Sequence, residues 1–155
     1  WNVHEQTPLP SLGPVESFKP LNYTGMDPQR HRALAKYALE QNGFDPGSGK
    51  IFSNQSGGLA EDLALIQSIP QWIEKQAHLA LILSSTEAAH SSLKRYKLSL
   101  EAVGKALGSA FQACGARPGI TLISPMGRNR TPNAMGGLDH HHSDCLKEGW
   151  LATFA

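Results

Sequence analysis

The sequence lacks any long hydrophobic run, which excludes a membrane-spanning helix. Its longest uninterrupted apolar stretch, Leu79-Ala80-Leu81-Ile82-Leu83, falls well short of the roughly 20 residues needed to cross a bilayer. No signal peptide is recognisable after Trp1, and there is no initiator Met. We therefore expect a processed or excised piece of a longer protein.

Charge and cysteine are also scarce. Charged residues make up 17% of the chain and the net charge is +1, which gives no field for attracting nucleic acid or a membrane surface. The two cysteines, Cys114 and Cys145, form neither a disulfide framework nor a metal-binding pattern. This favours a reducing, cytoplasmic setting with no nucleic-acid or membrane partner.

A run of three histidines, His140-His141-His142, is the one possible metal motif. Asp139 and Asp144 add possible ligands, but no further His or Cys follows at a characteristic spacing. Three adjacent imidazoles cannot all face one ion from a regular element. A solvated loop is favoured, and we predict no metal.

The 155 residues suffice for one domain with its own core. Residues 1–23 contain four prolines and little periodicity, which predicts an extended arm or linker in which 18–23 can form a short strand or dock on a surface. The folded portion is then 24–155. Its glycine- and proline-rich stretches predict a large share of loop.

Hydrophobic periodicity predicts the elements of the folded portion. Helices are expected at 28–41, ending at Asn42-Gly43, at 59–69, and at 71–76 after an interruption by Pro70. Short strands are expected at 50–52, 79–83, 120–123 and 150–154. These elements predict an α+β fold in which a small sheet packs against a long central helix.

The long helix lies within 78–126, read as a strand–helix–strand unit with a buried crossover. Ser84 and Glu87 have the spacing of a capping box, so the helix is expected to begin there. Its apolar seam is predicted to consist of Leu93, Tyr96, Leu100, Val103, Leu107, Ala110 and Cys114.

Gly104 and Gly108 interrupt this helix, at about 1 kcal/mol each relative to alanine. Such a cost indicates that something approaches the backbone closely, and tight helix packing is favoured over a planar ligand. Lys94, Arg95 and Lys97 open the helix, either as a solvated face or as a contact for an anionic group. Arg128 and Arg130 allow the same two interpretations.

Two other kinds of site lack support. Residues 47–50, Gly-Ser-Gly-Lys, look like a phosphate loop but lack the first glycine and the following Ser or Thr. His90 and Ser91 have no acid at a diagnostic spacing, and neither hydrolase motif, GxSxG or HExxH, is present.

From Tyr23 to Phe154 the chain resembles the C-terminal portion of the SagB-type dehydrogenases, the thiazole/oxazole-forming flavin oxidases of the nitroreductase superfamily. The likeness lies in the order of TGMDPQRHRAL, IPQWIEKQAHLALILSS, RYKLSLEAVGKALGSAFQACG and MGGLD. Within it, Tyr96-Lys97 resemble the family's aromatic–basic pair, and Val103-Gly104 with Ala106-Leu107 resemble part of its central helix. The resemblance implies a nitroreductase-like fold of which this chain is an incomplete half.

The same resemblance implies an FMN site and assigns roles. Lys94, Lys97, Gly104, Lys105 and Gly108 are the expected cofactor-binding residues, and His90 and Tyr96 the expected catalytic ones. The chain also departs from the family: His90-Ser91 replace a Lys-Tyr pair, Lys105 replaces a histidine, and Ala102 replaces an acidic residue. His90 is the best replacement base, since an imidazole titrates near neutral pH.

Two functional hypotheses follow from the resemblance. In the first, the chain is part of an FMN-dependent oxidoreductase that carries out azoline-type or related dehydrogenation in natural-product or modified-peptide biosynthesis. A second polypeptide or another copy would complete the flavin site, because the N-terminal half that grips the phosphate is missing. In the second, the chain is a catalytically inactive nitroreductase-like partner or substrate-binding subunit. An unrelated α/β or α+β protein is the third possibility.

Overall fold

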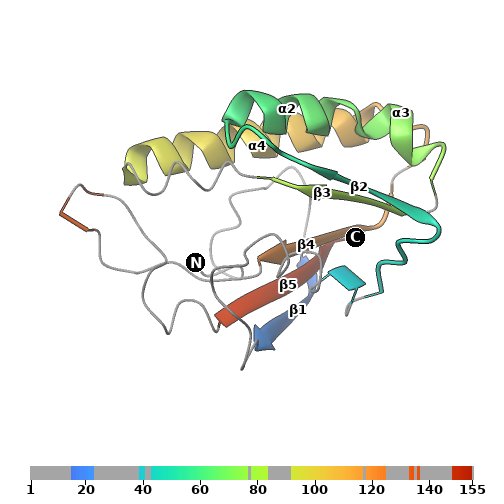
Figure 1. Cartoon of the computed structure of the whole chain (residues 1–155), viewed down its shortest axis with the longest axis horizontal. Coiled ribbons are helices and arrows are strands. Elements are labelled where there is room, and N and C mark those ends of the chain that lie inside the picture. The colour runs from blue at the N-terminus through green and yellow to red at the C-terminus, as the bar shows by residue number, and fades with distance from the viewer. Residues whose placement is uncertain are drawn as a thin grey trace.

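The computed structural model describes residues 15–22, 39–40, 43–76, 78–83, 92–116, 118–124, 133–134, 136 and 148–154. It is an α+β structure in which helices form a layer on one side of short strands (Figure 1). This confirms the coarse fold class expected from the sequence.

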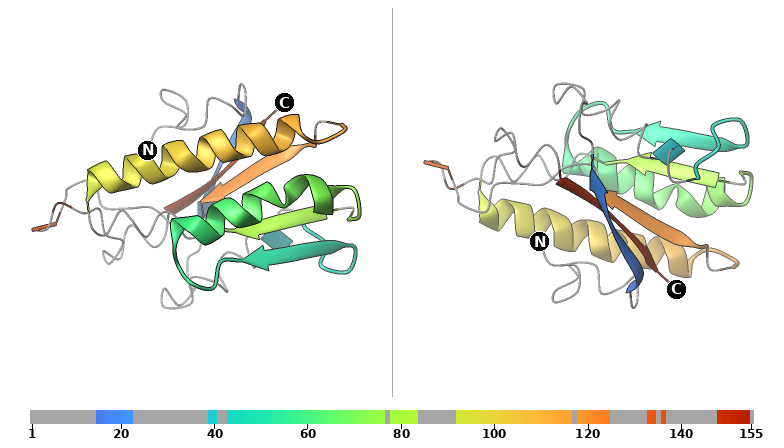
Figure 2. Two further views of the ribbon diagram at one scale, coloured as in Figure 1. Left: turned by 90° about the horizontal axis from the view of Figure 1, so that it is seen from above. Right: turned by 90° about the horizontal axis from the view of Figure 1, so that it is seen from below.

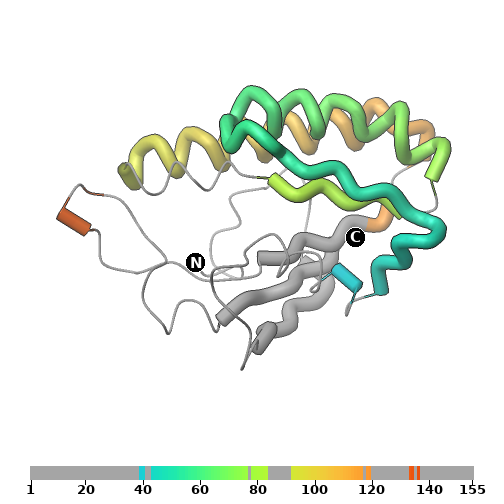
Figure 3. Tube along the Cα trace, in the orientation of Figure 1, coloured from blue at the N-terminus to red at the C-terminus, as the bar shows by residue number. Residues whose placement is uncertain are grey.

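The first structural unit is a parallel strand pair connected through helices. β2 (Gly49–Ser53) pairs with β3 (His78–Ile82), from Gly49 opposite His78 to Ser53 opposite Ile82. Between them the chain passes through α2 (Leu59–Gln67) and α3 (Ile69–Ile73), as the trace in Figure 3 shows. Parallel strands require such a crossover.

The second unit is a three-stranded antiparallel sheet in the order β1-β5-β4. It contains β1 (Val15–Asn22), β4 (Ile120–Ser124) and β5 (Glu148–Phe154). The segment 15–22, predicted as part of an arm or linker, is extended, but it is a paired strand of this sheet. Pro20 fits because β1 is an edge strand among the described elements, where a missing N–H is tolerated.

The strand–helix–strand reading of 78–126 needs a correction in its pairing. β3, α4 (Leu93–Gln112) and β4 follow one another as predicted, but β3 bonds to β2 whereas β4 bonds to β5. In both views of Figure 2, β3 lies between β2 and β4. The parallel crossover therefore belongs to β2–α2–α3–β3, because strand pairing depends on long-range contacts that periodicity does not encode.

The start of α4 was also predicted too early. Ser92 has an extended backbone, and its hydroxyl accepts a hydrogen bond from the N–H of Arg95 at 3.1 Å, so Ser92 is the N-cap. The N–H of Leu93 donates to the carbonyl of Gly136 at 3.2 Å, which attaches the helix start to the 133–136 turn. Ser84 and Glu87 lie outside the described residues.

The end of the predicted first helix is confirmed at its C-terminal cap. Gly43 has φ +96°, and its N–H donates to the carbonyl of Glu40 at 3.3 Å. The N–H of Phe44 donates to the carbonyl of Leu39 at 3.0 Å. These two bonds are those of a Schellman motif, which places a glycine at the left-handed position. Residues 28–38 lie outside the described part.

The core lies where α2, α3 and β3 meet α4. Ile66, Ile69, Val103, Leu107 and Ala110 form its buried cluster, and Leu79 and Leu81 pack against it. Most of the predicted α4 seam is thus confirmed. Two of its end positions differ: Leu93 is 37% exposed, and Cys114 lies beyond the helix and is half-buried.

Candidate functional site

Five of the predicted site residues share one side of α4. Successive residues of an α-helix are separated by about 100° of rotation, so these positions fall within a sector about 100° wide. We call it the lysine–glycine sector; it consists of Lys94, Lys97, Gly104, Lys105 and Gly108. The family resemblance implied these residues, and α4 places them on one side of the helix.

The side chains of the sector differ in exposure. Lys94, Lys97 and Lys105 are exposed, Gly104 is buried and Gly108 is half-buried. The three ammonium groups can donate hydrogen bonds to an anionic group, and the exposed Glu101 lies within the same sector. The burial of Gly104 agrees with the packing interpretation of its missing side chain, and Gly108 is the glycine whose backbone remains partly accessible.

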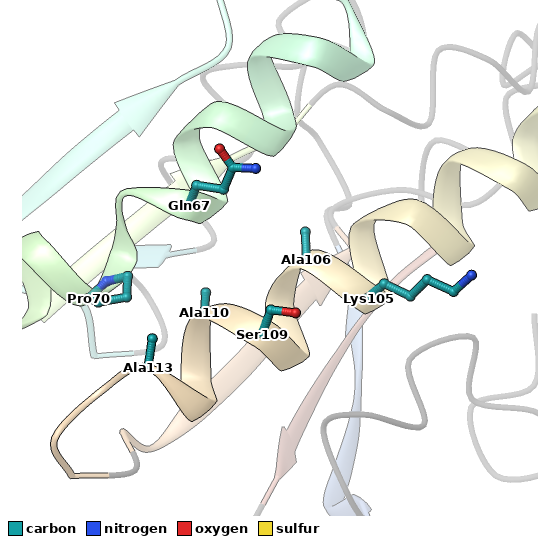
Figure 4. Close-up of a pocket in the computed structure, with 7 residues that line it drawn as sticks. All are labelled: Gln67, Pro70, Lys105, Ala106, Ser109, Ala110 and Ala113. Atoms are coloured by element: carbon teal, nitrogen blue, oxygen red, sulfur yellow. The ribbon is translucent and has the colours of Figure 1, made fainter.

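A groove of about 330 Å³ follows the neighbouring side of α4, where the helix faces α2 and α3. Its lining consists of Gln67, Pro70, Lys105, Ala106, Ser109, Ala110 and Ala113. Figure 4 shows the three alanines pointing towards Gln67 and Pro70, while the Lys105 side chain extends away from the groove. Lys105 thus lies at the boundary between the groove and the lysine–glycine sector.

The two predicted catalytic residues are not brought together in the described part of the chain. Tyr96 is only 9% exposed and lies about 100° around the helix from Lys97, on the buried face. His90 lies outside the described residues, so its role stays a prediction.

The remaining basic and metal candidates also fall outside the described residues. These are Arg128, Arg130, Asp139, Asp144 and the histidines His140, His141 and His142. Within the described ranges, no group of three or more His, Cys, Asp or Glu side chains is placed to hold a metal ion. In the same ranges no helix is long and apolar enough to cross a membrane.

The loop at 45–48 explains the superficial phosphate-loop motif. The carboxylate of Asp45 accepts hydrogen bonds from the N–H of Gly47 at 2.9 Å and the hydroxyl of Ser48 at 2.7 Å. The hydrogen bond from Ser48, and to a smaller extent that from Gly47, lowers the pKa of the Asp45 carboxyl below its ordinary value. The N–H and hydroxyl donors of the loop therefore already bind the carboxylate of Asp45 from the same loop, as in an Asx turn.

Sequence reasoning missed a buried polar network at the carboxyl end of β2. Asn54 is 1% exposed and Asp62 is 0% exposed. The Asn54 amide donates to Asp62 Oδ1 at 2.6 Å and to the carbonyl of Gly58 at 2.7 Å, and its Oδ1 accepts from the N–H of Gly57 at 2.8 Å. The network ties the end of β2 to the first turns of α2.

Glu61 reinforces the same loop from α2. Its carboxylate accepts from the N–H of Gln55 at 3.0 Å and from the N–H of Ser56 at 2.7 Å. The sequence signal was present: an Asn directly after a strand, and acidic residues in the first turn of the next helix. These residues predict only a turn and a helix start, because the burial of Asn54 depends on its contact with β3, where its N–H donates to the carbonyl of Ile82 at 3.0 Å.

Comparison with protein-family models, with curated proteins and with solved structures gives no match for this chain. The resemblance to the SagB-type dehydrogenases therefore remains a prediction.

Proposed function

We propose that this chain is one part of an FMN-dependent oxidoreductase whose flavin site is completed by a second polypeptide or another copy of the chain. The observation that supports the proposal is the lysine–glycine sector: three exposed ammonium groups and a half-buried glycine on one side of α4. A cationic strip beside accessible backbone is a suitable edge for a planar, anionic cofactor. The proposed reaction is azoline-type or related dehydrogenation of a small molecule or peptide.

In this proposal the residues of the chain bind and orient. Lys97 and Lys105 lie eight positions apart on α4, and their ammonium groups would hold anionic parts of FMN. Gly108 would let the ring approach the helix. When bound, FMN would supply the acceptor for hydride from a substrate carbon, and a proton acceptor such as His90 would complete the step.

The test begins with the intact chain co-expressed with the neighbouring reading frames of its gene. We expect a yellow complex that releases FMN when denatured. Lys97→Ala/Lys105→Ala should lower FMN affinity about tenfold or more, as the loss of charge-assisted contacts predicts. Lys50→Ala/Lys75→Ala removes the same charge from exposed side chains near α3 and is the matched control.

A second pair of variants tests the approach of the ring to the helix. Gly108→Leu should reduce FMN binding by blocking the backbone, whereas Gly115→Leu introduces the same side chain where an added Cβ has open space. Far-ultraviolet circular dichroism of each variant checks that it folds. A colourless complex, or FMN binding that responds equally to both lysine pairs, would refute the proposal.

The alternative, a catalytically inactive partner or substrate-binding subunit, is favoured by one observation. Tyr96 lies on the buried face of α4, away from the lysine–glycine sector, and so does not present its ring there. If the chain is active, His90→Ala should abolish substrate-dependent flavin reduction and leave FMN binding unchanged. FMN binding without any substrate-dependent reduction in the wild type would support the alternative.

A further inference from the structure

Among the described residues, β2 has one backbone edge to which no strand is paired. Its one strand partner among the described residues is β3, and both views of Figure 2 place β2 on the outer side of that pair. Among the residues that the structure describes, the backbone of Gly49–Ser53 makes one hydrogen bond besides the ladder to β3, from the Gln55 amide to the carbonyl of Ser53 at 3.0 Å. Unpaired N–H and C=O groups on an outer edge can accept an added strand.

A cationic aromatic cluster lies beside this edge. The ammonium group of Lys50 lies 5.0 Å from the ring centroid of Trp72 and 5.5 Å from that of Phe52. The ammonium group of Lys75 lies 5.6 Å from the Trp72 centroid. Trp72 and Phe52 are both half-buried, and both lysines are exposed.

Neither lysine of the cluster is neutralised by a carboxylate within the described residues, where their contacts are those to the two rings. Glu74 precedes Lys75 in the chain, and within the described residues it forms no ion pair with that lysine. Two positive charges thus converge around one tryptophan at a sheet edge. Tryptophan is a frequent anchor in protein interfaces.

Side chains alternate between the two faces of β2, and this alternation determines which side chains an added strand would contact on each face. Lys50 and Phe52 lie on the face of β2 that carries Trp72, and Ile51 lies on the other face. An added strand would therefore need acidic side chains on the first face and apolar ones on the second.

Two other occupants fit less well. A second copy of β2 would bring a second Lys50 to the same edge, and like charges on paired strands are destabilising. A single-stranded nucleic acid needs flat aromatic rings on which its bases can stack. The Phe52 and Trp72 rings are inclined at 57° to each other, and the ammonium groups of two lysines already lie over the Trp72 ring. The net charge of +1 also provides no steering towards nucleic acid.

We propose that the outer edge of β2 binds an extended segment of a partner protein in which acidic and apolar residues alternate, with Lys50, Lys75 and Trp72 selecting the acidic side chains. This site lies on β2 and α3 and does not depend on FMN binding to α4. Main-chain pairing supplies the affinity, and the lysines select the sign of the charge.

The probe is a fluorescein-labelled peptide of alternating Glu and Val, seven residues long, titrated with the full-length chain and followed by fluorescence anisotropy. We expect saturable binding that weakens as salt rises. Lys50→Glu/Lys75→Glu should weaken binding about tenfold or more, which corresponds to about 1.4 kcal/mol. Lys94→Glu/Lys97→Glu makes the same charge change on α4 and should leave the affinity unchanged. A peptide of alternating Lys and Val should not bind.

Strand pairing itself is tested with N-methylated peptides. In an added strand, alternate amides face β2 and the others face solvent. Methylating one alternate set of the probe's amides should abolish binding, and methylating the other set should not.

Four results would overturn the proposal. These are equal loss of binding in the two double variants, equal tolerance of both methylated peptides, tighter binding of a labelled single strand of thymidines, and a dimer in sedimentation experiments that Lys50→Glu alters. Failure of FMN to bind would leave the peptide result unaffected, so the two proposals fail separately.

Discussion

Replacing Asn54 by alanine should destabilise the chain more than its position in a turn-rich loop suggests. The side chain is 1% exposed; it donates hydrogen bonds to Asp62 Oδ1 and to the Gly58 carbonyl, and it accepts them from the Gly57 N–H and the Ser56 hydroxyl. Asp62 is 0% exposed, so water cannot replace the lost donor without a local opening.

The magnitude follows from the surroundings of each lost bond. Leaving a buried acceptor on Asp62 unsatisfied costs about 1–3 kcal/mol. Gly57 and Gly58 are exposed and can bond to water instead, so their two bonds contribute at the low end, about 0.5 kcal/mol each. We expect a loss of about 3 kcal/mol in the free energy of unfolding, which is a large share of the 5–15 kcal/mol typical of a domain.

The assay is urea unfolding followed by circular dichroism, with Gln55→Ala as the matched control. Gln55 is the next residue and is exposed, and its amide donates to the carbonyl of Ser53 at 3.0 Å, so its replacement should cost less than about 0.5 kcal/mol. A double-mutant cycle with Asp62→Ala should give a coupling energy of about 1 kcal/mol or more. If Asn54→Ala and Gln55→Ala unfold at the same urea concentration, the network does not hold β2 to α2 and the reasoning is wrong.

Two further predictions concern the helix layer. Leu107→Ala should cost about 2–5 kcal/mol, because the side chain is 6% exposed within the core cluster, whereas Leu98→Ala, 54% exposed on the same helix, should cost much less; urea unfolding of the pair decides this. Burial, and then the charge of Glu74, raise the pKa of the Cys114 thiol. In a Cys145→Ser background, Cys114 should therefore react with a disulfide reagent more slowly than a small free thiol at pH 8, and Glu74→Gln should speed the reaction. Stability should also fall as the pH rises past the ordinary pKa of a thiol, because the unfolded chain then loses its proton first; equal rates and a flat pH profile would contradict the burial argument.

Most helices and strands of the described residues follow from local patterns in the sequence. The short segments 50–52, 79–83, 120–123 and 150–154 all lie in strands, and the three- and four-residue spacing of Tyr96, Val103, Leu107 and Ala110 matches the buried side of α4. These patterns are local: a period of two or 3.6 residues already specifies the face that is buried. The residues of the lysine–glycine sector were expected from the family resemblance, and helical geometry adds only that they share one side of α4.

Strand pairing and the burial of polar groups become visible only in the folded chain. β3 pairs with β2 and not with β4, although α4 directly connects β3 to β4, and the segment 15–22 pairs with β5, whose first residue is Glu148. Asn54 and Asp62 have the composition of an exposed turn and a helix start, but both are buried, and the N–H of Asn54 donates to the carbonyl of Ile82 in β3 at 3.0 Å. Pairing and burial depend on contacts between residues far apart in the chain, and no local pattern encodes such contacts.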